Sequence, residues 1–311
     1  NRIQILKEKM LSQPRYVSIE QALIITKTYK QHENEPIILK RAYALANALR
    51  ELEIGIENEE LIVGNRTKGV RYGVVFPESG ISWVDREFET ISTRKQDKFL
   101  VRDEDIKIFR EQIVPYWKGK SLEDVIKQNF GKEISAINKV VKINQTDHAQ
   151  GHICPNVEKW LQKGVSGLLE DAQNHYENAD EDKKNFYQAI IIVMKAVQNF
   201  MLRYHDLLIA TAKDDEKNRA SLIKVADICK NISQRPPQTF HEAVQATWFL
   251  FVILHMESNA SSFSPGRLDK ILYPYYIKDI ENNILTKDEA LEIIECLWLK
   301  FNEIVYLRNQ H

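Results

Sequence analysis

Residues 144–156 hold a high density of side chains that can bind or activate a ligand. They include two histidines, one aspartate, two glutamines and two asparagines, next to a glycine and a proline. Polar side chains at a chain break between apolar helices are typical of a ligand-facing loop. A solvated loop with helix-capping side chains has the same composition. A zinc site of His148, His152 and Cys154 is a third interpretation, although their spacing matches no standard finger.

A second polar segment, residues 257–269, follows the most apolar stretch of the chain. It opens with Glu257-Ser258-Asn259 and contains three further serines. A buried helix that ends this way places hydroxyl and amide groups inside the protein, where they need hydrogen-bond partners. A small polar ligand is one such partner. The simpler alternative is a turn whose serines cap the next helix.

Other signatures of catalysis are missing from the sequence. It has no G-x-S-x-G elbow, no phosphate-binding P-loop and no G-x-G-x-x-G, so serine hydrolysis and nucleotide binding have no support. The 43 basic and 44 acidic residues leave a net charge of −1, without a basic stripe. A chain of this kind is a poor candidate for binding nucleic acid.

The three cysteines and the apolar runs indicate where in the cell the protein is located. The cysteines lie in unrelated contexts, which argues against a disulfide framework and for a reducing cytoplasm. The longest apolar run, residues 243–256, is shorter than the roughly 20 residues that cross a bilayer, so we expect a buried core helix. No signal peptide is visible. We therefore expect a cytoplasmic protein that contacts no membrane.

The elements that must position the two polar segments are mostly helices. A capping box, Ser or Thr followed three residues later by Gln or Glu, predicts helix starts at Ser18, Thr239 and Thr286. Pro36 predicts a further start before apolar residues at helical spacing. Helical patterns also cover residues 103–117, 121–130 and almost all of 156–232.

Strand predictions are few. Residues 61–65 form a short β-type run, and residues 72–76 form another that Pro77 stops. No fixed-period repeat appears, and no linker rich in glycine, serine or proline divides residues 1–311. The pattern predicts a mostly α-helical fold with few short strands and no firm domain boundary.

A set of ordered motifs along most of the chain resembles a known family. The motifs are Arg41-Ala42-Tyr43-Ala44-Leu45, Glu60-Leu61-Ile62-Val63-Gly64-Asn65, Phe76-Pro77-Glu78, Tyr116-Trp117-Lys118-Gly119-Lys120, Gly151-His152, Glu257-Ser258-Asn259, Ser264-Pro265-Gly266-Arg267-Leu268-Asp269 and Leu272-Tyr273-Pro274-Tyr275-Tyr276. In this order they resemble the glycyl radical enzymes of the pyruvate formate-lyase superfamily. The set looks closest to the branch of glycerol and diol dehydratases and choline lyase.

The resemblance implies roles for residues in both polar segments. In the glycerol dehydratase pattern, the positions of His152 and Ser262 contact substrate hydroxyls. Ser261 replaces a histidine of that pattern, which changes the expected substrate. His148 matches a position where other branches vary a ligand-binding residue. Asp147 and Asn259 complete the substrate-binding set that we predict.

The resemblance also implies parts that this sequence lacks. The family carries a thiyl-forming cysteine in a G-C-x-E loop and a radical-storing glycine in an R-V-x-G-Y loop, and neither motif occurs here. We therefore expect residues 1–311 to be an incomplete, N-terminal portion of a ten-stranded α/β barrel enzyme, with no catalytic residue of its own. The glycyl radical would lie in the missing part and be installed by a radical SAM activating enzyme. No bound cofactor or metal is expected, and dimers are usual in the family.

Three functions follow as hypotheses. The first is the substrate-binding portion of a radical dehydratase or lyase that expels a leaving group from a small hydroxylated molecule; this portion alone would be inactive. The second is a carbon–carbon lyase of the same superfamily, such as a formate acetyltransferase or a decarboxylase. The third is a non-catalytic helical binding module. The first predicts that His152 and Ser262 approach each other, inside an apolar shell that Trp248, Phe249, Phe251 and Phe263 help to form. An incomplete chain should also expose apolar surface.

Overall fold

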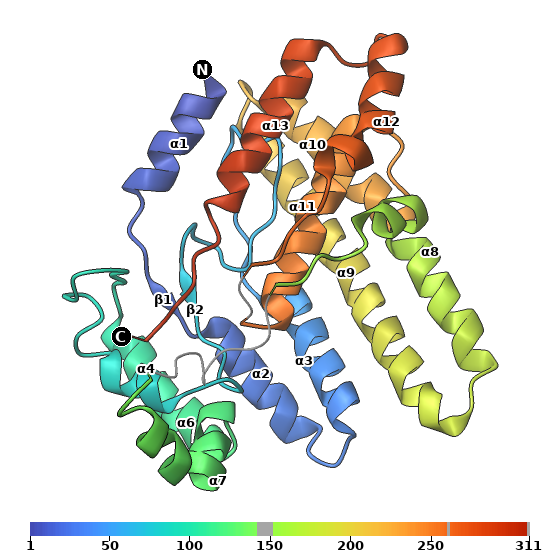
Figure 1. The fold of residues 1–311 in the computed structure, drawn as a ribbon. Helices are drawn as coiled ribbons and strands as arrows, with labels where there is room; N and C mark the ends of the chain where they lie inside the picture. The colour runs from blue at the N-terminus through green and yellow to red at the C-terminus, as the bar shows by residue number, and fades with distance from the viewer. Residues whose placement is uncertain (142–151, 260–261, 310–311) are drawn as a thin grey trace.

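A computed structural model describes residues 1–141, 152–259 and 262–309, and helices dominate it (Figure 1). The helices are α1 (Arg2–Ser12), α2 (Glu20–Gln31), α3 (Ile37–Glu51), α4 (Ser82–Glu87), α5 (Asp103–Ile108), the π-helical turn η1 (Phe109–Ile113), α6 (Val114–Trp117), α7 (Leu122–Ile137), α8 (Val157–Glu177), α9 (Glu181–Asp214), α10 (Arg219–Gln234), α11 (Phe240–Glu257), α12 (Leu268–Glu281) and α13 (Lys287–Phe301). The mostly helical fold is confirmed. No helix in the described part of the chain is both long and apolar enough to cross a membrane.

Two apolar cores support the helices. The larger core joins α3, α8, α9, α10, α11 and α13, and its fully buried members include Phe200, Tyr204 and Trp248. The smaller core lies between α2 and the group of helices α4, η1 and α6, where Phe109 and Ile113 are completely buried. Figure 1 shows α4, α6 and α7 gathered at one end of the molecule, away from α8, α12 and α13.

A short parallel strand pair links distant parts of the chain. The strands are β1 (Val17–Ser18) and β2 (Gly73–Val74), so the strand predicted at 72–76 is confirmed, although it is shorter than predicted. The predicted cap at Ser18 is wrong. Ser18 lies in β1, and α2 begins after Ile19 without any side-chain cap, because the pairing keeps the chain extended up to this point.

The strand predicted at residues 61–65 is also wrong, for a clear physical reason. The backbone N–H and C=O groups of this segment form hydrogen bonds with side chains instead of with a neighbouring strand. The Gln245 side chain accepts from the Val63 amide at 2.8 Å and donates to the Val63 carbonyl at 2.7 Å. Trp248 Nε1 donates to the Gly64 carbonyl at 2.8 Å. Helix α11 therefore provides the hydrogen bonds that a strand would otherwise supply.

The other two predicted capping boxes give different results. At Thr286 the box is complete: its hydroxyl accepts from the Glu289 amide, and the Glu289 carboxylate accepts from the Thr286 amide. At Thr239 only half forms, with the hydroxyl accepting from the Glu242 amide at 3.3 Å. The Glu242 carboxylate instead pairs with Arg235, at 2.8 Å.

The helical stretch predicted at 156–232 is confirmed as α8, α9 and α10, but α8 is kinked. Gly164, inside α8, has φ 63° and ψ 175°, a conformation that side chains with a Cβ rarely adopt. A Cβ at Gly164 would lie 2.9 Å from the backbone of Pro236. The close approach explains why glycine occupies this position.

A buried ion network joins α13 to the segment before residue 61. Lys300 Nζ donates to Glu60 at 2.7 Å and to Glu303 at 2.6 Å. Asn65 Nδ2 also donates to Glu303 Oε2, at 3.1 Å. Burial raises the pKa of Glu303 to about 7, although the Lys300 ammonium opposes that shift. All four side chains are buried, so the network depends on each partner.

The molecule also exposes apolar side chains, as we expected for an incomplete chain. A groove of about 430 Å³ runs between α12 and α13, and Tyr273, Leu291 and Trp298 line it. Each of the three is more than half exposed.

Candidate substrate-binding site

The two polar segments come together. The Ser264 amide donates to the Ile153 carbonyl at 2.8 Å, although the two residues lie far apart in the sequence. Close beside this bond, a Cβ added to Gly266 would lie 3.4 Å from Cys154 Sγ. One loop precedes α8 and the other follows α11, so these helices set the position of both.

His152 and Ser262, the two predicted hydroxyl contacts, precede the bonded residues Ile153 and Ser264 by one and two positions. Both are exposed, and both adopt a left-handed backbone, with φ of 60° and 65°. Few residues other than glycine take this conformation, and such strain gathers at functional sites. The loops that carry the two side chains thus lie together, on one exposed part of the surface.

The remaining predicted residues divide into two groups. Asn259 is 5% exposed, and its neighbour Ser258 is buried too, so polar groups do follow α11 into the interior. Asp147, His148 and Ser261 lie outside the described residues. The zinc interpretation needs His148 and therefore remains untested. Within the described ranges, no group of three or more His, Cys, Asp or Glu side chains could hold a metal ion.

Beneath the second loop lies a hydrogen-bonded chain that the sequence did not reveal. The Tyr306 hydroxyl lies 2.9 Å from His255 Nε2. Burial raises the pKa of this hydroxyl, and the nearby Ser262 backbone opposes that shift. The other ring nitrogen, His255 Nδ1, lies 2.7 Å from the Phe251 carbonyl. A carbonyl only accepts, so Nδ1 carries the proton and Nε2 accepts from Tyr306. Burial lowers the pKa of His255 to about 4, which keeps this ring neutral.

The end of α11, from which this loop starts, is anchored by three side chains. Arg66 is buried and donates to the carbonyls of His255 and Val305. Burial lowers the pKa of Arg66 to about 10, so the guanidinium stays charged at neutral pH. Gln21 donates to the Met256 carbonyl at 2.9 Å. Arg41 completes the set, because it forms an ion pair with Glu257, the last residue of α11. Cationic groups at a helix C-terminus also favour its dipole.

An apolar shell surrounds His255, with one correction to the prediction. Phe251 and Phe263 contact the His255 ring, with centroids 4.3 and 4.7 Å away. Trp248 stacks on Phe251 at 5.5 Å. Phe249 points elsewhere, into the core between α11 and α9, because one helical residue turns it about 100° from Trp248.

Sequence reasoning missed Tyr306 and Arg66. Tyr306 follows the last predicted helix without any pattern, so nothing in the sequence singled it out. Arg66 directly follows one of the quoted motifs but carried no signal of burial. A buried histidine in an apolar helix was the one available signal, because a histidine such as His255 needs polar partners.

Comparisons with known proteins concern the chain as a whole. The sequence model described as pyruvate formate lyase-like matches residues 1–311. The probable dehydratase YbiW of Escherichia coli is 34% identical, over 94% of this chain and 38% of its own length. The (2S)-3-sulfopropanediol dehydratase of Klebsiella oxytoca is 30% identical, over 99% of this chain and 39% of its own.

A solved structure extends the similarity to the fold. The glycerol-bound B12-independent glycerol dehydratase of Clostridium butyricum superposes with a TM-score of 0.93 and 32% identity. The match covers 99% of this chain and 40% of that enzyme, so the chain spans about two-fifths of the length of these relatives. With the family model matching from the first residue to the last, the chain belongs to the pyruvate formate lyase-like family.

Proposed function

We propose that this chain is the substrate-binding, N-terminal portion of a glycyl radical dehydratase or lyase that acts on a small hydroxylated molecule in the cytoplasm. The observation that carries the proposal is the Ser264–Ile153 hydrogen bond, which joins the loops of His152 and Ser262. The names of the two dehydratase relatives, for sulfopropanediol and glycerol, favour elimination over carbon–carbon cleavage.

In this proposal the two loops hold the substrate by its hydroxyl groups. The His152 ring and the Ser262 hydroxyl bind and orient one hydroxyl, so that a single C–H bond faces the attacking group. In the same proposal, the side chains of Asp147, His148, Ser261 and Asn259 determine which substituents the substrate can carry. Phe251 and Phe263 supply apolar surface beside the loop, which helps to exclude water.

The radical itself must come from polypeptide outside these residues. A glycyl radical, installed by a radical SAM activating enzyme, would supply the abstraction of a hydrogen atom. None of the three cysteines fits the role of the thiol that contacts substrate. Cys229 and Cys296 are buried within α10 and α13, and burial raises the pKa of both. Cys154 is exposed, but it precedes Pro155 and does not lie in a G-C-x-E motif. A homodimer of the whole protein belongs to the same proposal.

The test uses the full-length protein, activated without oxygen by its activating enzyme, with glycerol and 1,2-propanediol as first substrates. We expect aldehyde formation, and a loss in kcat/KM of about 10²-fold in His152→Gln and Ser262→Ala, because a misplaced substrate reacts slowly. The glycyl radical signal in electron paramagnetic resonance should stay at the wild-type level. His175→Gln, which changes an exposed histidine on α8, is the matched control.

Two outcomes would overturn the proposal. One is wild-type turnover in both loop variants. The other is a fully formed radical with no product from any of a panel of diols, amino alcohols and hydroxy acids, which would favour a binding module.

A further inference from the structure

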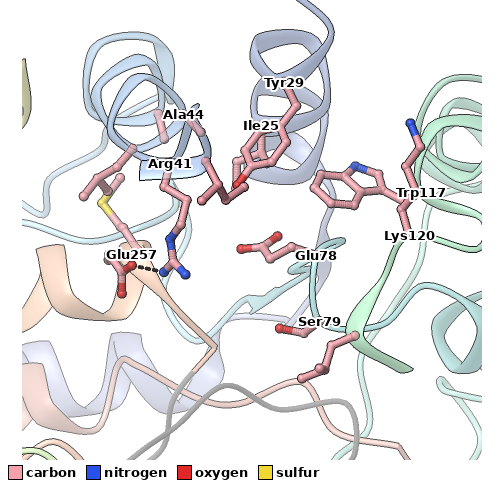
Figure 2. A pocket seen from close by; sticks show the side chains of 14 residues that line it. Ile25, Tyr29, Arg41, Ala44, Glu78, Ser79, Trp117, Lys120 and Glu257 are labelled. Atoms are coloured by element: carbon pink, nitrogen blue, oxygen red, sulfur yellow. Dashed lines mark hydrogen bonds and ion pairs between the residues drawn. The ribbon is translucent and has the colours of Figure 1, made fainter. Parts of the chain in front are cut away.

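A cavity of about 320 Å³ lies beside the end of α11, apart from His152 and Ser262 (Figure 2). Helices α2 and α3 form one wall, and the segments after β2 and α6 form another. Ile37 and Leu122, both exposed, mark its open side. The cavity is large enough for a ligand of several non-hydrogen atoms.

The chemistry of this cavity centres on one carboxyl group. Figure 2 shows the Glu78 side chain between Arg41 on one side and Trp117 on the other. Glu78 Oε2 is buried and has no hydrogen-bond partner within the part of the chain that the structure describes. Burial raises the pKa of Glu78 to about 7, although its own backbone amide and the Arg41 charge oppose the shift. A buried acceptor without a donor is costly, so this group needs a partner.

The surrounding charges leave room for a cation. Arg41 is engaged with Glu257 in an ion pair. The Lys120 ammonium lies 4.2 Å from the centroid of the Tyr116 ring. It therefore makes a cation–π contact with Tyr116 rather than an ion pair with Glu78. When Glu78 is ionised, Glu78 and Glu257 therefore face a single guanidinium, and one negative charge is in excess.

Two aromatic rings complete the cavity. Tyr29 and Trp117 lie with their centroids 5.1 Å apart. Trp117 Nε1 already donates to Thr26 Oγ1 at 2.8 Å, so its indole contributes ring surface rather than a free donor. A carboxylate next to aromatic rings is a suitable environment for an organic ammonium ion, through an ion pair and cation–π attraction.

We propose that this cavity binds a small organic ammonium ion, whose N–H groups donate to Glu78 and whose carbon atoms pack against Tyr29 and Trp117. The site is additional to the loops of the proposed radical enzyme. Its connection to them is Glu257, because this residue pairs with Arg41 in the cavity and also begins the second loop.

The experiment measures binding of propylammonium to the full-length protein by calorimetry and tryptophan fluorescence, with 1-propanol as a neutral ligand of the same size. We expect saturable binding of propylammonium only, weakened at least tenfold in Glu78→Gln. Glu89→Gln removes an exposed carboxylate that pairs with Arg110 and should bind as the wild type does. No activity assay is needed, so the result is independent of the proposed radical chemistry.

The pH profile gives a second readout. Arg41, Glu257, Lys120 and the Tyr29 hydroxyl also face or line the cavity. Because burial raises the pKa of Glu78 to about 7, we expect binding to tighten from pH 6 to pH 8 as Glu78 loses its proton. If Glu78→Gln does not fold, carboxyl NMR of the wild type replaces it, and propylammonium should lower the Glu78 pKa. Equal binding of 1-propanol, unchanged affinity in a folded Glu78→Gln, or an unmoved Glu78 pKa would overturn the proposal.

Discussion

Single buried polar side chains determine where the second loop lies. The Tyr306 hydroxyl lies near the Ser262 backbone and donates to His255, and His255 in turn is fixed by the Phe251 carbonyl. Each bond contributes about 1 kcal/mol, but losing one partner leaves others unpaired inside the protein. The left-handed backbone at Ser262 is maintained by this neighbourhood rather than by its own preference.

Removing the Tyr306 hydroxyl tests this dependence. In Tyr306→Phe the buried His255 Nε2 loses its donor and the Ser262 backbone loses a polar neighbour, so the loop should become less ordered. We expect KM for the hydroxylated substrate of the full-length protein to rise about tenfold, and stability to fall by about 1–2 kcal/mol. Steady-state kinetics and urea unfolding measure the two effects. Tyr273→Phe, on the exposed face of α12, should change neither; an unaltered KM in Tyr306→Phe would contradict the role.

A second buried histidine predicts a pH dependence of stability. Burial lowers the pKa of His241 to about 4, from an ordinary value near 6.5. Between about pH 6.5 and pH 4, His241 is protonated in the unfolded chain but stays neutral in the folded protein. The free energy of unfolding therefore decreases as the pH falls through this range. The expected loss from His241 at pH 4 is about 2–3 kcal/mol.

The measurement compares wild type with His241→Gln, whose amide can still reach the Leu61 carbonyl that the His241 ring contacts at 2.6 Å. The difference in unfolding free energy between the two proteins should shrink steadily below pH 6.5. A constant difference between pH 7 and pH 4 would show that His241 is not the titrating group.

Among the elements, α8 has the clearest local constraint. Gly164 combines a left-handed backbone with close contact to Pro236. In Gly164→Ala we expect a loss of about 2–4 kcal/mol, since the new methyl group meets backbone atoms and the conformation disfavours any side chain. Thermal and urea unfolding would measure it. The control is Gly167→Ala in the same helix, where a Cβ would meet only the Lys163 side chain at 3.5 Å; it should be neutral or slightly stabilising. Similar losses in both variants would rule out a special role for Gly164.

The sequence predicted helices well where the signal is local. The Thr286 box and the helix after Pro36 depend on neighbouring residues, and both formed. The strand at residues 61–65 failed because its partners are side chains of α11, far along the chain. The helix at Ser18 started late because β2 competes for that residue. For the candidate site, the two polar loops were evident from composition, but their contact and the support from Tyr306 arise only in the folded molecule.

At the scale of the whole molecule, the Lys300 network joins α13 to residues 60–65, which lie more than 230 positions earlier in the chain. Lys300→Met would leave Glu60 and Glu303 facing each other in the interior without a cation. We expect a loss of about 3–5 kcal/mol at neutral pH. Lys217→Met removes an exposed lysine that pairs with Glu59 and should cost at most about 1 kcal/mol. Equilibrium unfolding of both variants measures the contrast, and equal losses would mean that the buried network contributes nothing special.

The anchoring of Arg66 has a consequence for biosynthesis. Its partner at Val305 is 239 residues further along the chain, so Arg66 reaches the ribosome surface long before the carbonyl that it binds. At about 5–20 residues per second, the delay is on the order of 10–50 s. During this interval the Arg66 side chain remains hydrated, and the segment around it lacks the hydrogen bond that fixes its position in the folded protein. This part of the core therefore stays incomplete until residues 300–309 have been synthesised and have docked, and until then the nascent chain exposes it to chaperones.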